Sequence, residues 1–203
     1  MKTIQVTPEE MQKRLFCWEG AKPITRHDDY APELKRDVVA ERLYGVITSN
    51  DPNDSTAESN LFDSAPILSG VANFAMSIIS CPPRQGPVLH VHHFTYETFT
   101  IFTGKWKFDW GDNGEHTVTL EHWDTISFPP GVPRRFENAS DDRSYMQVVV
   151  YGEGKITDDI AMPAHVEDYL VERHGREMIG QMKERGASFT AGQDGPVRQP
   201  ARR

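Results

Sequence analysis

Three of the chain's eight histidines lie within four residues, at His90, His92 and His93, and a carboxylate follows at Glu97. Because side chains on a β-strand alternate between its two faces, His90 and His92 would share one face of a strand. In an unbroken strand Glu97 would point the other way, so we expect a turn at residues 94–96. The three side chains could then offer two nitrogens and one oxygen to a first-row divalent metal, which would keep open positions for substrate or oxygen.

The same residues have a second explanation that needs no metal. They could be polar side chains that hydrogen-bond to one another inside or at the mouth of a barrel. Burying two imidazoles and a carboxylate without partners costs several kcal/mol, and a metal ion would offset that cost directly. His93 has the opposite strand parity from His92, so we expect it to make contacts around the site or between subunits rather than to bind the metal.

The run histidine, one residue, histidine, four residues, glutamate, six residues, glycine extends from His90 to Gly104 and resembles the first signature of the cupin superfamily. The second signature is proline-x-glycine-x2-histidine-x3-asparagine, and residues 129–138 are similar to it. Arg134 stands where the family usually has its fourth metal ligand, and Trp123 replaces the glycine of the usual Gly-Asp pair before Pro129. The resemblance covers about residues 67–151.

This resemblance implies an all-β fold, the double-stranded β-helix or jelly roll, in which two sheets close into a barrel. It also implies a divalent transition metal at His90, His92 and Glu97, with Fe(II) favoured and Mn, Ni, Co or Zn as alternatives. A homodimer is implied as well, because barrels of this family often pair through sheet edges or exchanged N-terminal strands. The superfamily contains dioxygenases, isomerases, lyases, sugar-binding regulators and storage proteins, so the fold does not fix the reaction.

The spacing of short apolar segments independently favours a barrel or sandwich. Between residues 71 and 151, turn signals recur about every 8–12 residues, and Asn113-Gly114 is typical of a hairpin. Thr7-Pro8-Glu9-Glu10 predicts a helix start with a capping box, and residues 163–174 predict a second helix. A further helical piece carries Met178, Ile179 and Met182 and stops near Gly186. We expect four parts: an N-terminal helix and irregular arm packing on the barrel at 1–66, the cupin β-barrel at 67–152, a C-terminal helical extension at 153–186, and a disordered tail at 187–203.

Arg134 leaves three interpretations open. A guanidinium is always charged and cannot bind a metal, but its fork is suited to a carboxylate. Arg134 could clamp a substrate carboxylate or enolate against the metal. It could instead pair with Glu97 in a site without metal, or it could lie outside the cavity.

Four further residues are candidates for contact with a substrate. Phe99 and Phe136 are expected to line an apolar cavity, and Gln147 on the last strand is expected to point inward with them. Tyr96 could donate a hydrogen bond to the substrate and take part in catalysis beside Arg134. For the aromatic residues, the alternative is packing in the core and in hairpins.

Composition excludes several classes of protein. The formal net charge of −8 argues against a general nucleic-acid surface. No apolar run approaches the roughly 20 residues needed to cross a bilayer, so we expect no membrane partner. Cys17 and Cys81 are too few and too far apart for a disulfide framework or a structural zinc site, which favours a reducing, cytoplasmic location.

The favoured function is therefore a metal-dependent cupin enzyme, most simply a dioxygenase-type oxidoreductase acting on a small anionic or aromatic organic substrate. One alternative is a non-redox isomerase or lyase that uses the same metal as a Lewis acid. Another is a metal-free ligand-binding cupin in which Arg134 and Glu97 form an internal ion pair.

Overall fold

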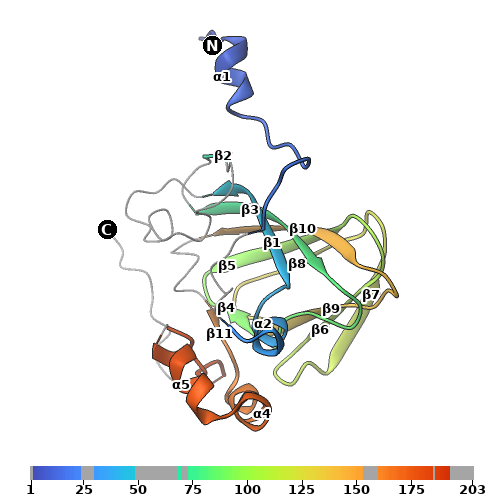
Figure 1. Cartoon of the computed structure of the whole chain (residues 1–203), viewed down its shortest axis with the longest axis vertical. Coiled ribbons are helices and arrows are strands. Elements are labelled where there is room, and N and C mark those ends of the chain that lie inside the picture. The colour runs from blue at the N-terminus through green and yellow to red at the C-terminus, as the bar shows by residue number, and fades with distance from the viewer. Residues whose placement is uncertain are drawn as a thin grey trace.

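The computed structural model describes residues 2–23, 30–48, 68–69, 73–152, 160–184 and 186–192. Among these residues β-strands are the commonest regular elements and form two facing sheets, and helices cover one end of the barrel (Figure 1). Parts of the predicted arm (24–29 and 49–66) and residues 193–203 of the predicted tail lie outside the described residues. No helix among the described residues is long and apolar enough to span a membrane.

The larger sheet has the strand order β2-β1-β3-β10-β5-β8, and the smaller one has the order β7-β6-β9. A two-stranded sheet pairs β11 with β4. The strands are β1 (Arg42–Thr48), β2 (Leu68–Ser69), β3 (Phe74–Cys81), β4 (Val91–His92), β5 (Thr95–Ile101), β6 (Trp106–Trp110), β7 (His116–Leu120), β8 (Thr125–Phe128), β9 (Arg134–Asn138), β10 (Ser144–Gly152) and β11 (Ile160–Ala161). Only β1 and β2 pair in parallel among these strands. The predicted jelly-roll fold is confirmed, and the Asn-Gly signal marks the β6–β7 hairpin.

Aromatic rings fill the space between the two sheets. Phe99 on β5 is fully buried, and its ring centroid lies 5.1 Å from that of Phe108 on β6 and 5.2 Å from that of Phe136 on β9. Trp106, also fully buried, packs edge-on against Phe136. Such tilted pairs add to the free energy of burial, and the side chains interdigitate because each strand alternates inward and outward positions.

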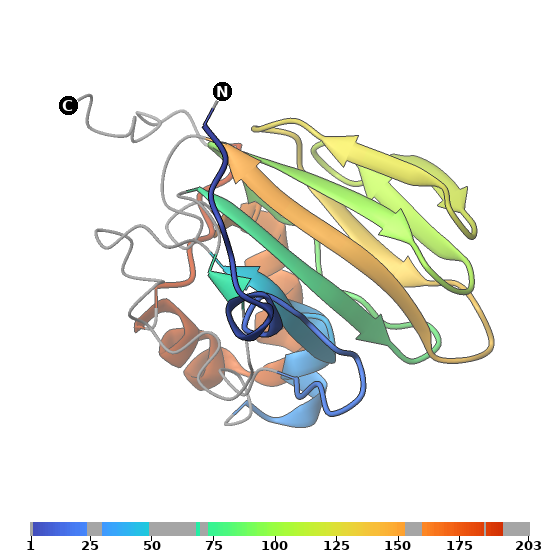
Figure 2. The same ribbon diagram turned by 90° about the horizontal axis from the view of Figure 1, so that it is seen from above.

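A second apolar cluster joins the C-terminal extension to the barrel. Helices α4 (Ala164–His174) and α5 (Arg176–Glu184) lie to one side of the strands, near α2 (Pro32–Val38) (Figure 2). The cluster has buried members from all three helices, from the chain before β4, and from the segments that precede α4 and follow α5: Leu34, Leu89, Met162, Val166, Leu170, Ile179, Met182 and Phe189.

Residues 187–192 depart from the predicted disordered tail. Phe189 is buried in the helical cluster, and the backbone of Met162 exchanges hydrogen bonds with Ser188 and Ala191. The apolar surface of Phe189 and these backbone partners hold the segment against the extension.

The N-terminal arm begins with α1 (Pro8–Gln12), which has the predicted capping box. The Glu10 N–H donates to Thr7 Oγ1 at 3.2 Å, and the Thr7 N–H donates to Glu10 Oε2 at 2.7 Å. The helix has no buried residue and projects from the body of the molecule (Figure 1). The arm contacts the outer face of the larger sheet at Trp18, whose ring centroid lies 4.8 Å from that of Tyr44.

Candidate metal centre

The segment that carries the two histidines lies between the barrel and the C-terminal extension. Leu89 is buried in the helical cluster, and Val91 is buried against Ala161 of β11. Strand alternation therefore turns His90 and His92 to the opposite side, into the barrel, as the sequence predicts.

Glu97 reaches the same region because the strand is interrupted. β4 ends at His92, and β5 begins at Thr95 after a bend at residues 93–94, one residue earlier than the predicted turn. In β5 the residues Thr95, Glu97, Phe99 and Ile101 are buried and alternate with more exposed ones. Glu97 is held between Val150 of β10 and Phe128 of β8, its neighbours in the sheet.

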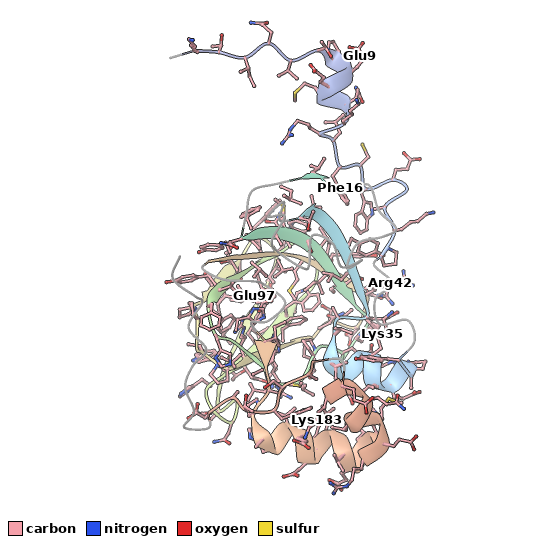
Figure 3. All side chains as sticks on the ribbon, turned by 90° about the vertical axis from the view of Figure 1, so that its left-hand side faces the viewer. Glu9, Phe16, Lys35, Arg42, Glu97 and Lys183 are labelled. Carbon is pink, nitrogen blue, oxygen red and sulfur yellow. The ribbon has the colours of Figure 1, made fainter. Side chains whose placement is uncertain are left out.

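The two imidazoles and the carboxylate converge on one position. One donor atom from each of His90, His92 and Glu97 lies within 4.8 Å of the others. His90 Nε2 and His92 Nε2 are each 3.9 Å from Glu97 Oε2. Figure 3 shows Glu97 inside the body of the barrel, far from the projecting arm that carries Glu9.

The His90 ring presents an unprotonated nitrogen to this position. Its Nδ1 lies 2.9 Å from the Val88 carbonyl oxygen, which can only accept, so Nδ1 carries the proton of the neutral ring. Burial, followed by the positive charge of Arg134, lowers the pKa of His90 to about 4. The Nε2 lone pair therefore faces Glu97 near neutral pH. Metal-bound histidines commonly have this arrangement, because a hydrogen bond from one nitrogen orients the other toward the metal.

His92 is oriented by a side chain that the sequence analysis missed. Its Nδ1 lies 3.1 Å from Thr95 Oγ1, at the first residue of β5. Thr95 lies between the predicted ligands, and its spacing of three residues from His92 is the only sequence signal of this contact. The Val88 carbonyl is a backbone group and has no sequence signal.

Arg134 faces Glu97, the contact that the second of the three interpretations requires. Its side chain is fully buried, and Nε donates a hydrogen bond to Glu97 Oε2 at 3.0 Å. Nη2 lies 2.9 Å from the same oxygen, although its N–H groups make no well-directed hydrogen bond, and Nη1 donates to the Val132 carbonyl at 3.3 Å. Burial alone would raise the pKa of Glu97, but the charges of Arg134, His92 and His90 together hold this pKa below its usual value.

The residues present fit a divalent metal ion. The donor set combines two imidazole nitrogens and a carboxylate oxygen, and at least His90 offers its lone pair in the neutral state. With metal–ligand bonds of about 2.0–2.2 Å, neighbouring donors on one ion lie about 3.0–3.5 Å apart, so the three groups must draw closer together than the 3.9 Å that separates each imidazole from Glu97. The ion would bind the same carboxylate that Arg134 contacts.

Two of the predicted substrate-binding residues lie on the wrong face. Tyr96 is 41% exposed and stacks on Tyr151 outside the barrel, because it alternates with the inward Glu97. Gln147 alternates with the buried Met146 and Val148, so it also faces outward, and its Nε2 lies 3.2 Å from Met76 Sδ. The last strand alternates as predicted, but its inward face carries Met146 and Val148 rather than Gln147.

Phe99 and Phe136 do share an interior face with the site. Phe99 is two residues beyond Glu97, and Phe136 is two residues beyond Arg134. Their rings pack against each other in the aromatic core, which is the packing alternative that the sequence analysis left open. His93 does not belong to the donor cluster, and its ring contacts Phe94.

Comparison with known protein families gives a match that agrees with this architecture. Residues 77–159 match a family model described as a cupin domain. Among solved structures, the chain is similar to a Klebsiella pneumoniae protein with a double-stranded β-helix domain, with 19% identity over 44% of this chain and 73% of that chain and a TM-score of 0.39. It is also similar to a predicted oxalate decarboxylase from Thermotoga maritima, with 22% identity over 39% of this chain and 66% of that chain and a TM-score of 0.36. A sugar phosphate isomerase from Silicibacter pomeroyi has 20% identity over 41% of this chain and 54% of that chain, with a TM-score of 0.37. The chain thus spans only about half the length of the isomerase that it matches. No curated protein matches the chain.

Proposed function

We propose that this chain, whose residues 77–159 match a cupin domain, is a metal-dependent enzyme of the dioxygenase type. The substrate would be a small anionic or aromatic organic molecule. His90, His92 and Glu97 would hold a divalent transition metal, with Fe(II) favoured over Mn, Ni, Co or Zn. A set of two histidines and one carboxylate with open positions is typical of non-haem Fe(II) oxygenases.

One observation supports this proposal above the others. Three potential ligand atoms from β5 and the segment around β4 lie within 4.8 Å of one another in the interior. Two of them are nitrogens at 3.9 Å from the same carboxylate oxygen, and the His90 lone pair faces that oxygen with no proton between them. Two electron-rich groups that face each other favour a cation in the space they enclose.

Each residue then has a separate task. A bound metal would supply Lewis acidity and bring the substrate and O₂ together. The Val88 carbonyl and Thr95 hold the two imidazole rings in orientation. The His90 side chain is 12% exposed, against 4% for His92, so it marks the more open side of the cluster, from which a substrate would approach. The aromatic core beyond Phe99 keeps water from the inner side.

The test combines metal analysis with oxygen consumption. Protein purified without chelator is expected to contain close to one equivalent of a transition metal, and His92→Ala should lose it. With the metal loaded, a panel of small carboxylates, enols and catechols should reveal substrate-dependent O₂ uptake. Turnover that persists without oxygen would favour the isomerase or lyase alternative. A protein that binds no added metal would refute the proposal.

The Arg134–Glu97 ion pair favours a second candidate, a metal-free ligand-binding cupin. The guanidinium already neutralises the only carboxylate of the cluster. In this case binding of small organic acids should be unchanged by chelators, and added metal should not raise the melting temperature. A metal that bound only the folded state would raise it.

A homodimer is part of the proposal, supported by apolar side chains on the arm. Met11 and Leu15 are 48% and 51% exposed, and α1 has no buried residue. Light scattering coupled to gel filtration should give twice the mass of the chain, and removing residues 1–12 should shift the protein to a monomer if the arm forms the interface. The cytoplasmic location stays a prediction.

A further inference from the structure

The guanidinium of Arg134 binds the same oxygen that faces the two histidines. Nε and Nη2 approach Glu97 Oε2 at 3.0 and 2.9 Å, and both imidazole Nε2 atoms are 3.9 Å from that atom. A partner that only supported a metal ligand would bind the carboxylate oxygen remote from the ion. Arg134 instead occupies lone pairs that a metal would need.

We infer that Arg134 and the metal compete for Glu97, so that the site takes up a metal together with a small carboxylate that pairs with the released guanidinium. This inference rests on the proposed function. It assigns Arg134 a regulatory role over metal occupancy and gives the substrate an anionic group.

Charge and burial carry the first step. Arg134 is fully buried, and its charge together with that of Glu97 sums to zero. A divalent ion beside an unchanged guanidinium would leave two like charges in a site of low dielectric constant, which is strongly unfavourable. Metal binding therefore requires the guanidinium to weaken its contact with Oε2, and the ion pair lowers the metal affinity.

Once it has left Glu97, the guanidinium needs another partner. Its remaining hydrogen bond is Nη1 to the Val132 carbonyl, which is neutral. A buried guanidinium without a counter-ion is unfavourable, so an anion must replace Glu97. A carboxylate fits best, because it can accept two parallel N–H groups from the fork. By linkage, such an anion raises the metal affinity by the same factor by which the metal raises the affinity for the anion.

The backbone places Arg134 where a true ligand would also reach the centre. His90 and Arg134 face each other across an antiparallel bridge, with reciprocal backbone hydrogen bonds of 3.0 and 2.8 Å. Residues directly opposite in such a pair project to the same side of the sheet. Arg134→His is therefore expected to add a fourth nitrogen to the cluster, whereas Arg134→Gln removes the competing charge alone.

The experiment is a titration with Mn²⁺ in carboxylate-free buffer, followed through the electron paramagnetic resonance signal of the free ion. Affinity is measured with and without acetate, with chloride at equal ionic strength as the reference. For the wild-type protein, acetate should tighten Mn²⁺ binding several-fold or more. Arg134→Gln should bind Mn²⁺ about 10- to 100-fold more tightly without acetate, the range by which groups bonded to metal ligands alter affinity. Its response to acetate should vanish.

Arg135→Gln is the matched control, because Arg135 is the neighbouring residue on β9 but pairs with Asp109 and is half exposed. Its Mn²⁺ affinity, with and without acetate, should equal that of the wild type. If Arg134→Gln folds poorly, Arg134→His and Arg134→Lys provide the same comparison, with tighter binding expected only for histidine. Equal Mn²⁺ affinity in the wild type and Arg134→Gln, or an acetate effect that persists in Arg134→Gln, overturns the inference while the metal site stands. No Mn²⁺ binding to any variant refutes the proposed function itself.

Discussion

Replacing Glu97 by glutamine in the chelated protein should be strongly destabilising, because it leaves Arg134 as a buried charge without a partner. At 2.9 Å the attraction between the two groups is about 6 kcal/mol with an effective dielectric constant of about 20, and desolvation offsets part of it. Removal of one partner from a buried pair typically costs about 3–5 kcal/mol. For a chain of this length we expect the melting temperature to fall by roughly 10 °C.

The assay is urea unfolding of the wild type and Glu97→Gln in the presence of chelator, with Glu41→Gln as the control. Glu41 also binds an arginine through two short contacts, of 2.9 and 3.1 Å to Arg143, but both side chains are about 30% exposed. Its replacement should cost at most about 1 kcal/mol, because solvent screens the pair. If Glu97→Gln lowers the free energy of unfolding by no more than Glu41→Gln does, the buried ion pair does not stabilise the metal-free protein.

The remaining predictions concern pH, packing and backbone space. Burial lowers the pKa of His90 to about 4, so on acidification the unfolded chain takes up a proton at this residue at a higher pH than the folded protein does. The free energy of unfolding of the chelated protein should therefore fall as the pH drops from about 6.5 toward 4. Urea unfolding of His90→Gln should show a smaller fall over the same pH range. Leu89→Ala, at a buried position behind His90, should lower the free energy of unfolding by about 2–5 kcal/mol. Gly86→Ala would place its Cβ 1.8 Å from the Phe136 carbonyl oxygen and should cost at least about 3 kcal/mol in the same assay, the upper end of the usual cost of overpacking. Gly131→Ala, with open space around its Cβ and a φ of +83°, should cost only about 1–2 kcal/mol, and an equal loss at both glycines would contradict the steric argument.

The sequence was sufficient for the fold and for the shared direction of His90 and His92. Side chains alternate along a strand, so His90 and His92 share a face. The interruption between β4 and β5 is what lets Glu97 point to the same side as the two histidines. The same rule failed for Gln147, because alternation groups residues without showing which group faces inward. Tyr96 shows a related limit: β5 begins at Thr95, inside the predicted turn, so Tyr96 is a strand residue that points outward next to the inward Glu97.

The state of Arg134 could not be predicted from its position in the chain. Three interpretations were compatible with the motif, and they differ only in where a long, flexible side chain places its charged end. The structure excludes the position outside the cavity through two contacts to Glu97 and full burial, and it leaves the other two for the metal titration to separate. The arrangement of Phe99 and Phe136 was likewise open, because an apolar residue that faces inward can line a cavity or fill it.

The pairing of β11 with β4 has a consequence for how the centre is assembled. Ile160 lies beside His92, and Ala161 lies beside Val91. During synthesis, a ribosome must therefore complete some 70 residues after the histidines before their supporting strand exists, and the helices that enclose Leu89 emerge later still. The centre is completed only after the barrel strands have been made, so a chain truncated before α4 should fail in metal uptake even where its barrel strands have paired.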